Sequence, residues 1–222
     1  MADHPYPPEP WYLGGSLLVS VFLVPPTALP PTFALPAGRR PVTVGGRISV
    51  GVAAVRYVPG GVLQYDELLV AVPSLGRGGI RVTIPQIWVD SDTSRRGGRE
   101  LWGIPKELAD FDRAGDAPRV TASMSIDDRP VARVTARRGR PLLPGMRQIA
   151  LPILQDLDGR TTLSHNRVIG RISGLRTAWR FAPDGPLGYL AGRRPLLNVE
   201  LHDASIIFGM DVARTSTGSS PA

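Results

Sequence analysis

The chain has 222 residues, of which 42% are hydrophobic and 20% are charged, and its formal net charge is +7. This balance supports a packed core and argues against a disordered chain or a coiled coil. Cysteine is absent, which excludes disulfides, Cys-based metal sites and a thiol nucleophile. Three scattered histidines cannot make a His-rich metal site alone, so we expect no metal.

The high content of glycine (25) and proline (23) predicts frequent turns and few long helices. Residues 1–10 form a Pro-rich N-terminal arm, ordered or loose, and the Pro-studded segment 25–41 cannot be a regular element. The low-complexity tail 213–222 is expected to be disordered. Strand-like runs lie, in chain order, at 13–24, 42–58, 64–72, 80–89, 119–125, 130–136, 147–151, 166–175, 178–181 and 196–207.

Residues 104–111 are the best candidate for a short helix. Pro105 suits a first helical turn, Glu107 lies near the positive helix start, and Leu108 and Phe111 fall on one face. No repeat or linker divides the rest of the chain, so residues 11–212 are predicted to form one mainly β domain. So many strands must close their sheet or pack as two sheets.

Membrane and nucleic-acid partners are not expected. The apolar run 13–24 has 12 residues, whereas a membrane-spanning helix needs roughly 20. The N-terminus lacks the basic region of a signal peptide, so we expect a cytoplasmic protein. Arginines are scattered singly or in pairs and aromatic residues make up only 6%, which favours a solvated basic surface over a base-stacking platform, although an Arg-rich nucleic-acid binder stays a minor alternative.

Lys106 is the one lysine among 26 basic residues, and the other 25 are arginines. An arginine keeps its proton, whereas a lysine amine can lose it and attack a carbonyl. Lys106 is therefore either a chance survivor in a genome that disfavours lysine codons or a position that needs a nucleophilic amine.

The surroundings of Lys106 in the sequence suit the second reading. The residues just before it are largely apolar, among them Leu101, Trp102 and Ile104. Burial in such surroundings disfavours a charged amine and lowers its pKa. The competing interpretation is a surface lysine paired with Glu107 or Glu100.

The segment GRELWGIPKELADF, residues 98–111, resembles the acetoacetate decarboxylase family around its Schiff-base lysine, which carries a GRE-x-x-x-x-PK signature. Upstream, Tyr65-Asp66-Glu67 resembles the family's Tyr-x-Glu segment, and Glu67 precedes Lys106 by 39 positions. The likeness extends more weakly through RVIGRISGLRTAWRFAP and covers about residues 10–211.

The resemblance implies a cone-shaped, mostly antiparallel β-barrel with one or two short helices, assembled as a homo-oligomer. It implies that Lys106 forms an iminium with a small-molecule β-keto acid, that carbon dioxide leaves and that hydrolysis releases a ketone, without pyridoxal or metal. Glu67 would position groups or shuttle a proton. The expected substrate pocket comprises Tyr65, Leu101, Trp102, Ile104, Glu107 and Arg99.

Two positions depart from the decarboxylase pattern. The decarboxylase has a second lysine directly after the reactive one, but this chain has Glu107, whose charge would favour a protonated amine. Activation must then come from desolvation, unless Arg95, Arg96 or Arg99 folds nearby. The decarboxylase also has an arginine in its N-terminal strand region near the substrate, and this chain has no arginine before Arg39.

For a protein of this family three functions stay open, besides the nucleic-acid alternative given above. The first is decarboxylation of a β-keto acid by a Schiff-base lyase. The second is aldolase-dehydratase chemistry, which condenses a keto acid such as pyruvate with an aldehyde through the same amine. The third is a non-catalytic barrel that binds a small ligand while Lys106 stays protonated.

Overall fold

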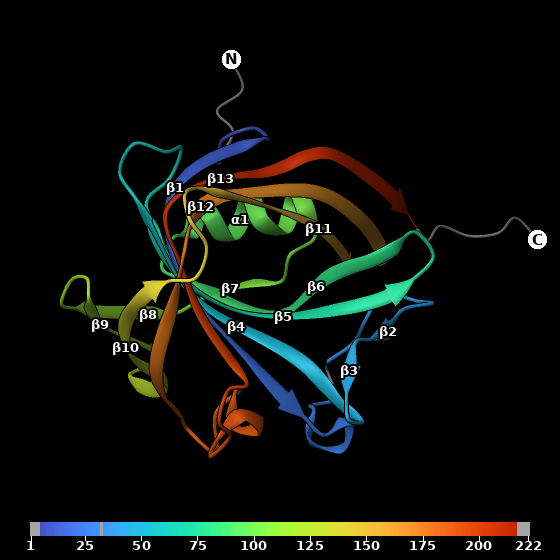
Figure 1. Ribbon diagram of the computed structural model, residues 1–222. Coiled ribbons are helices and arrows are strands. Elements are labelled where there is room, and N and C mark those ends of the chain that lie inside the picture. The colour runs from blue at the N-terminus through green and yellow to red at the C-terminus, as the bar shows by residue number, and fades with distance from the viewer. Residues whose placement is uncertain (1–4, 32, 217–222) are drawn as a thin grey trace, which may run out of the picture.

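Long antiparallel strands make up most of the computed structural model, which describes residues 5–31 and 33–216 (Figure 1). The strands are β1 (Trp11–Val24), β2 (Arg40–Pro41), β3 (Thr43–Val44), β4 (Arg47–Val58), β5 (Tyr65–Gly76), β6 (Gly79–Val89), β7 (Lys106–Leu108), β8 (Asp110–Ala114), β9 (Arg119–Ile126), β10 (Arg129–Pro141), β11 (Arg147–Leu157), β12 (Arg160–Phe181) and β13 (Leu197–Ser216). Within the described residues there is one α-helix, α1 (Asp92–Trp102), and two 3-10 turns, η1 (Pro26–Ala28) and η2 (Gly188–Leu190).

All of these strands belong to one sheet that closes partially in a ring. Its order is β11-β6-β5-β4-β1-β13-β12-β10-β9-β8, and β11 also pairs with β12. Seven strands thus return on themselves, and β10, β9 and β8 extend the sheet beyond the ring. The β6–β11 pairing is the shortest in the ring. It is parallel and pairs Ile153 with Val82 alone. The predicted mainly β, mostly antiparallel single domain is confirmed.

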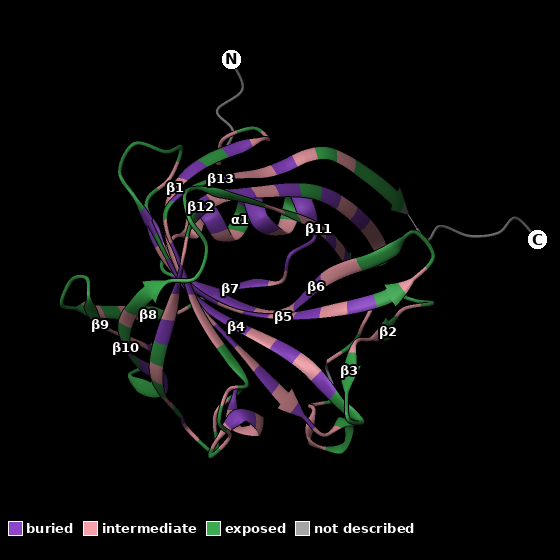
Figure 2. Ribbon diagram, viewed as in Figure 1, coloured by how far each residue is buried: buried purple, intermediate pink, exposed green. Residues whose placement is uncertain are grey.

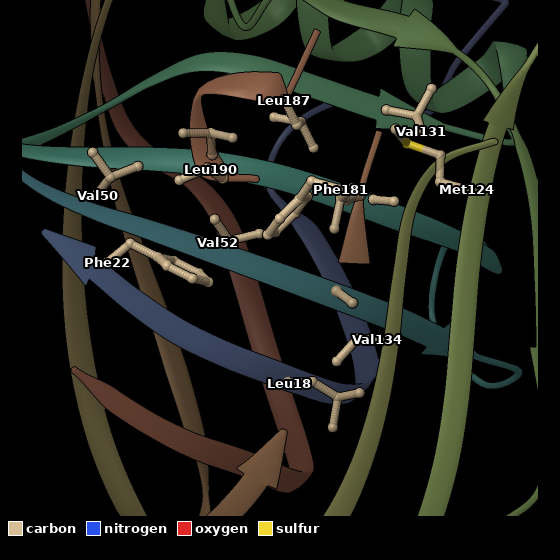
Figure 3. Close-up of a cluster of buried hydrophobic side chains, with 14 of the residues drawn as sticks. Leu18, Phe22, Val50, Val52, Met124, Val131, Val134, Phe181, Leu187 and Leu190 are labelled. Atoms are coloured by element: carbon tan, nitrogen blue, oxygen red, sulfur yellow. The ribbon is translucent and has the colours of Figure 1, made fainter. Parts of the chain in front are cut away.

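Buried residues alternate with half-buried ones along the strands β1, β4 and β5 (Figure 2). These strands contribute apolar side chains to a cluster on each face of the sheet, which explains why most of their residues are apolar. One face packs on the β9–β10 hairpin and on η2, and Figure 3 shows this cluster, which includes Leu18, Phe22, Val52, Met124 and Leu190. The other face looks into the ring, where a second cluster gathers around Trp11, Leu13, Val55, Trp102 and Ile206. We call it the ring-interior cluster.

The helix prediction for residues 104–111 is wrong, because these residues form β7 and β8. The helix lies earlier, at α1. Ser91 caps its start, with Oγ accepting from the Ser94 backbone N–H at 3.2 Å, and Gly103 ends it in the left-handed conformation at φ 64°. After that turn the chain runs parallel to β6, with Lys106 opposite Ile87.

The C-terminal end of the domain is more ordered than the sequence suggested, and the described part of the N-terminal arm is ordered, one of the two states that the sequence left open. Residues 213–216 belong to β13 and pair with β12, so the expected disorder is wrong for them, while 217–222 lie outside the described residues. In the N-terminal arm the described residues pack on the domain, since Trp11 Nε1 donates to the Pro7 carbonyl and Trp102 Nε1 to Glu9. The predicted strands 166–175 and 178–181 are one strand, β12.

The arm, α1 and β1 meet so closely that α1 has no room for a side chain at Gly97. A Cβ there would lie 2.5 Å from Cζ2 of the buried Trp11 ring. No helix in the described part of the chain is long and apolar enough to cross a membrane, and α1 serves instead to pack against the strands β6, β7, β12 and β13.

We predict that Gly97→Ala lowers the free energy of unfolding by about 2 kcal/mol. Overpacking costs about 1–3 kcal/mol, and a contact with a buried ring lies at the upper end of this range. The higher helix propensity of alanine offsets about 1 kcal/mol of that cost. Urea unfolding measures the change. Gly51→Ala is the matched control, because its Cβ would make an ordinary contact of 3.5 Å with the Ala71 carbonyl. Equal stability of the two variants would refute the close approach of α1.

Candidate active site

A cavity of about 310 Å³ lies inside the ring. Side chains from all seven ring strands line it, together with Trp102 of α1, Ile104 and β7. Its lining is apolar except for five residues, Tyr57, Tyr65, Glu67, Lys106 and Asn166. Four of these five, all but Asn166, are joined by one hydrogen-bond network.

Lys106 is 4% exposed and directs its amine into this network. Its Nζ lies 2.8 Å from Glu67 Oε2, 2.9 Å from Ser94 Oγ and 3.3 Å from the Tyr65 hydroxyl. The Tyr57 hydroxyl donates to the other Glu67 oxygen at 3.3 Å. The three N–H donors of the ammonium group therefore each have a partner, and both carboxylate oxygens of Glu67 are bonded.

Helix α1 shapes the path of the lysine side chain. Ser94 and Gly98 lie four residues apart and so share one face of the helix, next to β7. Ser94 supplies a hydroxyl to the amine, and a Cβ at Gly98 would lie 2.6 Å from Lys106 Cδ. The glycine of the GRE motif is thus required because the lysine stem crosses the helix backbone there.

Burial and charge act on the pKa of Lys106 in opposite directions. Burial lowers it, but the Glu67 carboxylate and Tyr65 raise it by more, so the net pKa lies above the ordinary value. Burial raises the pKa of Tyr65 and raises that of Tyr57 strongly. At neutral pH the ammonium is charged and both phenols are neutral, contrary to the expectation that desolvation alone leaves the amine uncharged.

Glu107 does not oppose activation in the way the sequence suggested. Successive residues of β7 point to opposite faces, so the Glu107 side chain is 60% exposed, and its carboxylate accepts from Arg99 Nη1 at 2.8 Å. Arg95 and Arg96 both pair with Asp92. None of these arginines lines the cavity, and Lys106 is the only cation among its described lining residues.

Five of the eight predicted site residues line the cavity, namely Lys106, Glu67, Tyr65, Trp102 and Ile104. The other three do not. Arg99 and Glu107 pair with each other toward solvent, and Leu101 only packs at the edge of the ring-interior cluster. The catalytic roles of Lys106 and Glu67 stay predictions.

Three polar residues of the site, Ser94, Tyr57 and Asn166, were not among the predicted site residues. Ser94 gives no signal, since a serine in an Arg-rich helix looks like a surface residue. Tyr57 is placed by the register of β4 and β5, which pairs it with Tyr65 and brings the two ring centroids within 4.4 Å, with the ring planes inclined by 35°. Asn166 lies within β12 between His165 and Arg167, and a polar run of this kind does not mark its middle residue as one that faces an apolar cavity.

We predict that Glu67→Gln moves the pKa of Lys106 from above the ordinary value of ~10.4 to below it, because the charge that raises it is removed and burial continues to lower it. Protein labelled in lysine with carbon-13 gives one side-chain titration, since the chain has one lysine. Glu107→Gln is the control and should leave the midpoint unchanged. An unchanged midpoint in Glu67→Gln would contradict the ion pair.

Replacing Lys106 with methionine should destabilise the protein by about 3–5 kcal/mol, because Glu67, 3% exposed, is left as an unpaired buried charge. The double variant Lys106→Met/Glu67→Met removes both charges and should recover most of that loss. Thermal and urea unfolding test both. A double variant less stable than the single one would show that the two side chains do not form a pair in solution.

Comparisons with known proteins identify the family and the fold. The model of the acetoacetate decarboxylase (ADC) family matches residues 4–163, and no curated protein matches the sequence significantly. The acetoacetate decarboxylase of Legionella pneumophila is similar in structure at a TM-score of 0.71 and 15% identity, over 96% of this chain and 90% of that chain. The enduracididine biosynthesis enzyme MppR complexed with pyruvate gives 0.67 and 17%, over 98% and 95%.

A second MppR structure, complexed with the condensation product of pyruvate and imidazole 4-carboxaldehyde, gives a TM-score of 0.65 and 18% identity, over 98% of this chain and 94% of that chain. At such identities the solved structures establish the fold. The family model, however, covers well over half of the chain. This protein therefore belongs to the acetoacetate decarboxylase family.

Proposed function

We propose that this protein is a Schiff-base-forming lyase that decarboxylates a β-keto acid on Lys106. The observation that carries the proposal is the Lys106 amine, 4% exposed and 2.8 Å from a Glu67 oxygen, on the wall of an apolar cavity. Such an amine can add to a ketone once it loses its proton, and the cavity offers the ketone a place beside it.

Glu67 is the natural acceptor of that proton. It already accepts a hydrogen bond from Nζ, so transfer requires no movement of either residue. Proton transfer converts two buried charges into a neutral amine and a neutral acid. Low polarity around the pair favours this neutral form, because burial disfavours charged groups. The protonated Glu67 can then give its proton to the carbinolamine hydroxyl, which departs as water.

The iminium formed in this way acts as the electron sink. The electrons of the bond between the α-carbon and the carboxylate move toward the iminium nitrogen, carbon dioxide leaves and an enamine forms. Protonation of the α-carbon and addition of water then release the ketone and restore the amine. The apolar lining assists because it stabilises neutral carbon dioxide more than the carboxylate that enters.

A second candidate is aldol condensation of pyruvate with an aldehyde. It is favoured by the MppR structure complexed with the condensation product of pyruvate and imidazole 4-carboxaldehyde, which covers 98% of this chain. In that reaction pyruvate would form an enamine on Lys106, the enamine carbon would attack the aldehyde and water would leave. The first steps on Lys106 are the same, so one experiment tests both candidates.

Borohydride reduction in the presence of acetoacetate or pyruvate should add the matching mass to the peptide that holds Lys106. The Lys106→Arg variant keeps a charge opposite Glu67 but cannot lose its proton, so it should not be labelled. Glu67→Gln should slow turnover by about 10²–10⁴-fold as a proton acceptor is lost.

Mass spectrometry reads the label, and evolved carbon dioxide or the condensed product distinguishes the two reactions. If neither ketone labels the protein, or if the label persists in Lys106→Arg, the Schiff-base proposal fails. A protein that binds the keto acid without any label would be the non-catalytic binding member of the family.

A further inference from the structure

The cavity beyond Lys106 offers a ligand almost nothing polar. Asn166 is the one polar lining residue outside the lysine network, and its amide is already engaged. Its Nδ2 donates to the Leu151 carbonyl at 3.0 Å, and its Oδ1 accepts from the Gly209 N–H at 2.7 Å. Away from Lys106, the described walls therefore present apolar contact and no free donor or acceptor aimed at a ligand.

The lining of the cavity also extends along β5. Tyr65, Glu67, Leu69 and Ala71 alternate onto the ring interior and all line it. Ala71 is four positions beyond Glu67, and at about 3.3 Å per position this distance along the strand is roughly 13 Å. Near the far end the walls include the small residues Ala53 and Ala71, which leave space where larger side chains would close it.

Because the polar groups of the cavity, apart from the engaged Asn166, all lie near Lys106, a second polar group on the substrate would weaken its binding. A carboxylate or hydroxyl carried to the Ala71 end would be buried without a partner, which costs free energy. The keto group and its neighbouring carboxylate can lie only at the opposite end, beside the Lys106 ammonium and the hydroxyls of Tyr57, Tyr65 and Ser94. The site thus has one polar end and one long apolar end.

We infer that the preferred substrate is a 3-oxo acid with an apolar chain much longer than the methyl group of acetoacetate. Its keto carbon sits at Lys106 and its chain runs along β5 toward Ala71. The inference rests on the proposed Schiff-base function. It assigns the substrate class of that site, and the product is then the methyl ketone of the same chain.

The test is borohydride trapping with a series of methyl ketones, from acetone through 2-heptanone to 2-undecanone, at free concentrations below their solubility limits. Methyl ketones are the products, so they report imine formation without the decarboxylation step. We expect the apparent affinity to rise by about fourfold per added methylene, from ~0.8 kcal/mol per buried CH₂, until the cavity is filled. Peptide mapping confirms that the label is on Lys106.

Two variants test the position of the chain. Ala71→Phe narrows the far end of the cavity and should lower the ratio of 2-undecanone to acetone labelling by tenfold or more. Ile80→Phe adds the same bulk on the neighbouring strand β6 at a residue that is 57% exposed and does not line the cavity, so its ratio should match that of the parent protein. Circular dichroism checks that both variants are folded.

The outcomes separate this inference from the proposed function. Equal labelling by short and long ketones would leave the Schiff base intact and overturn the long-chain assignment, as would an unchanged ratio in folded Ala71→Phe. Absence of any label on Lys106 with every ketone would overturn the function itself, and with it this assignment.

Discussion

The buried ion pair between Lys106 and Glu67 is the constraint on which the rest of this site depends. Two charges that are less than 5% exposed are tolerated only when each has further hydrogen bonds. Ser94 and Tyr65 supply them to the amine, and Tyr57 supplies one to the carboxylate. The pair therefore joins β4, β5, α1 and β7, which come from four separate parts of the chain, at one point in the ring.

Much of the local sequence around the lysine serves that junction. Gly97 and Gly98 weaken α1 as an isolated helix, yet their missing side chains let Trp11 and the lysine stem pack against its backbone. Gly103 turns the chain so that β7 runs parallel to β6. Alternation along β7 then directs Lys106 inward and sends Glu107 out to Arg99.

The sequence predicted the strands well, because β1, β4 and β5 are apolar on both faces and flanked by turns. The sequence did not predict α1, because its glycines and arginines form no apolar stripe. It wrongly predicted a helix at 104–111, because Pro105 and Glu107 are residues typical of a helix start. The approach of Glu67 to Lys106 depends on pairing across 39 positions, which local patterns cannot show; only the family resemblance suggested it. Cellular location and assembly stay predictions.

The raised pKa of Lys106 has a consequence for how such a site could react. A permanently neutral amine would be open to any ketone, whereas this amine keeps its proton while Glu67 is ionised and close. Both groups are already buried, and an apolar ligand that fills the cavity they line also keeps water out of that cavity. Surroundings of such low polarity disfavour the ion pair relative to the neutral pair. In the proposed mechanism, reactivity would then be coupled to occupancy by an apolar chain, and a second cation beside the lysine would not be needed to achieve it.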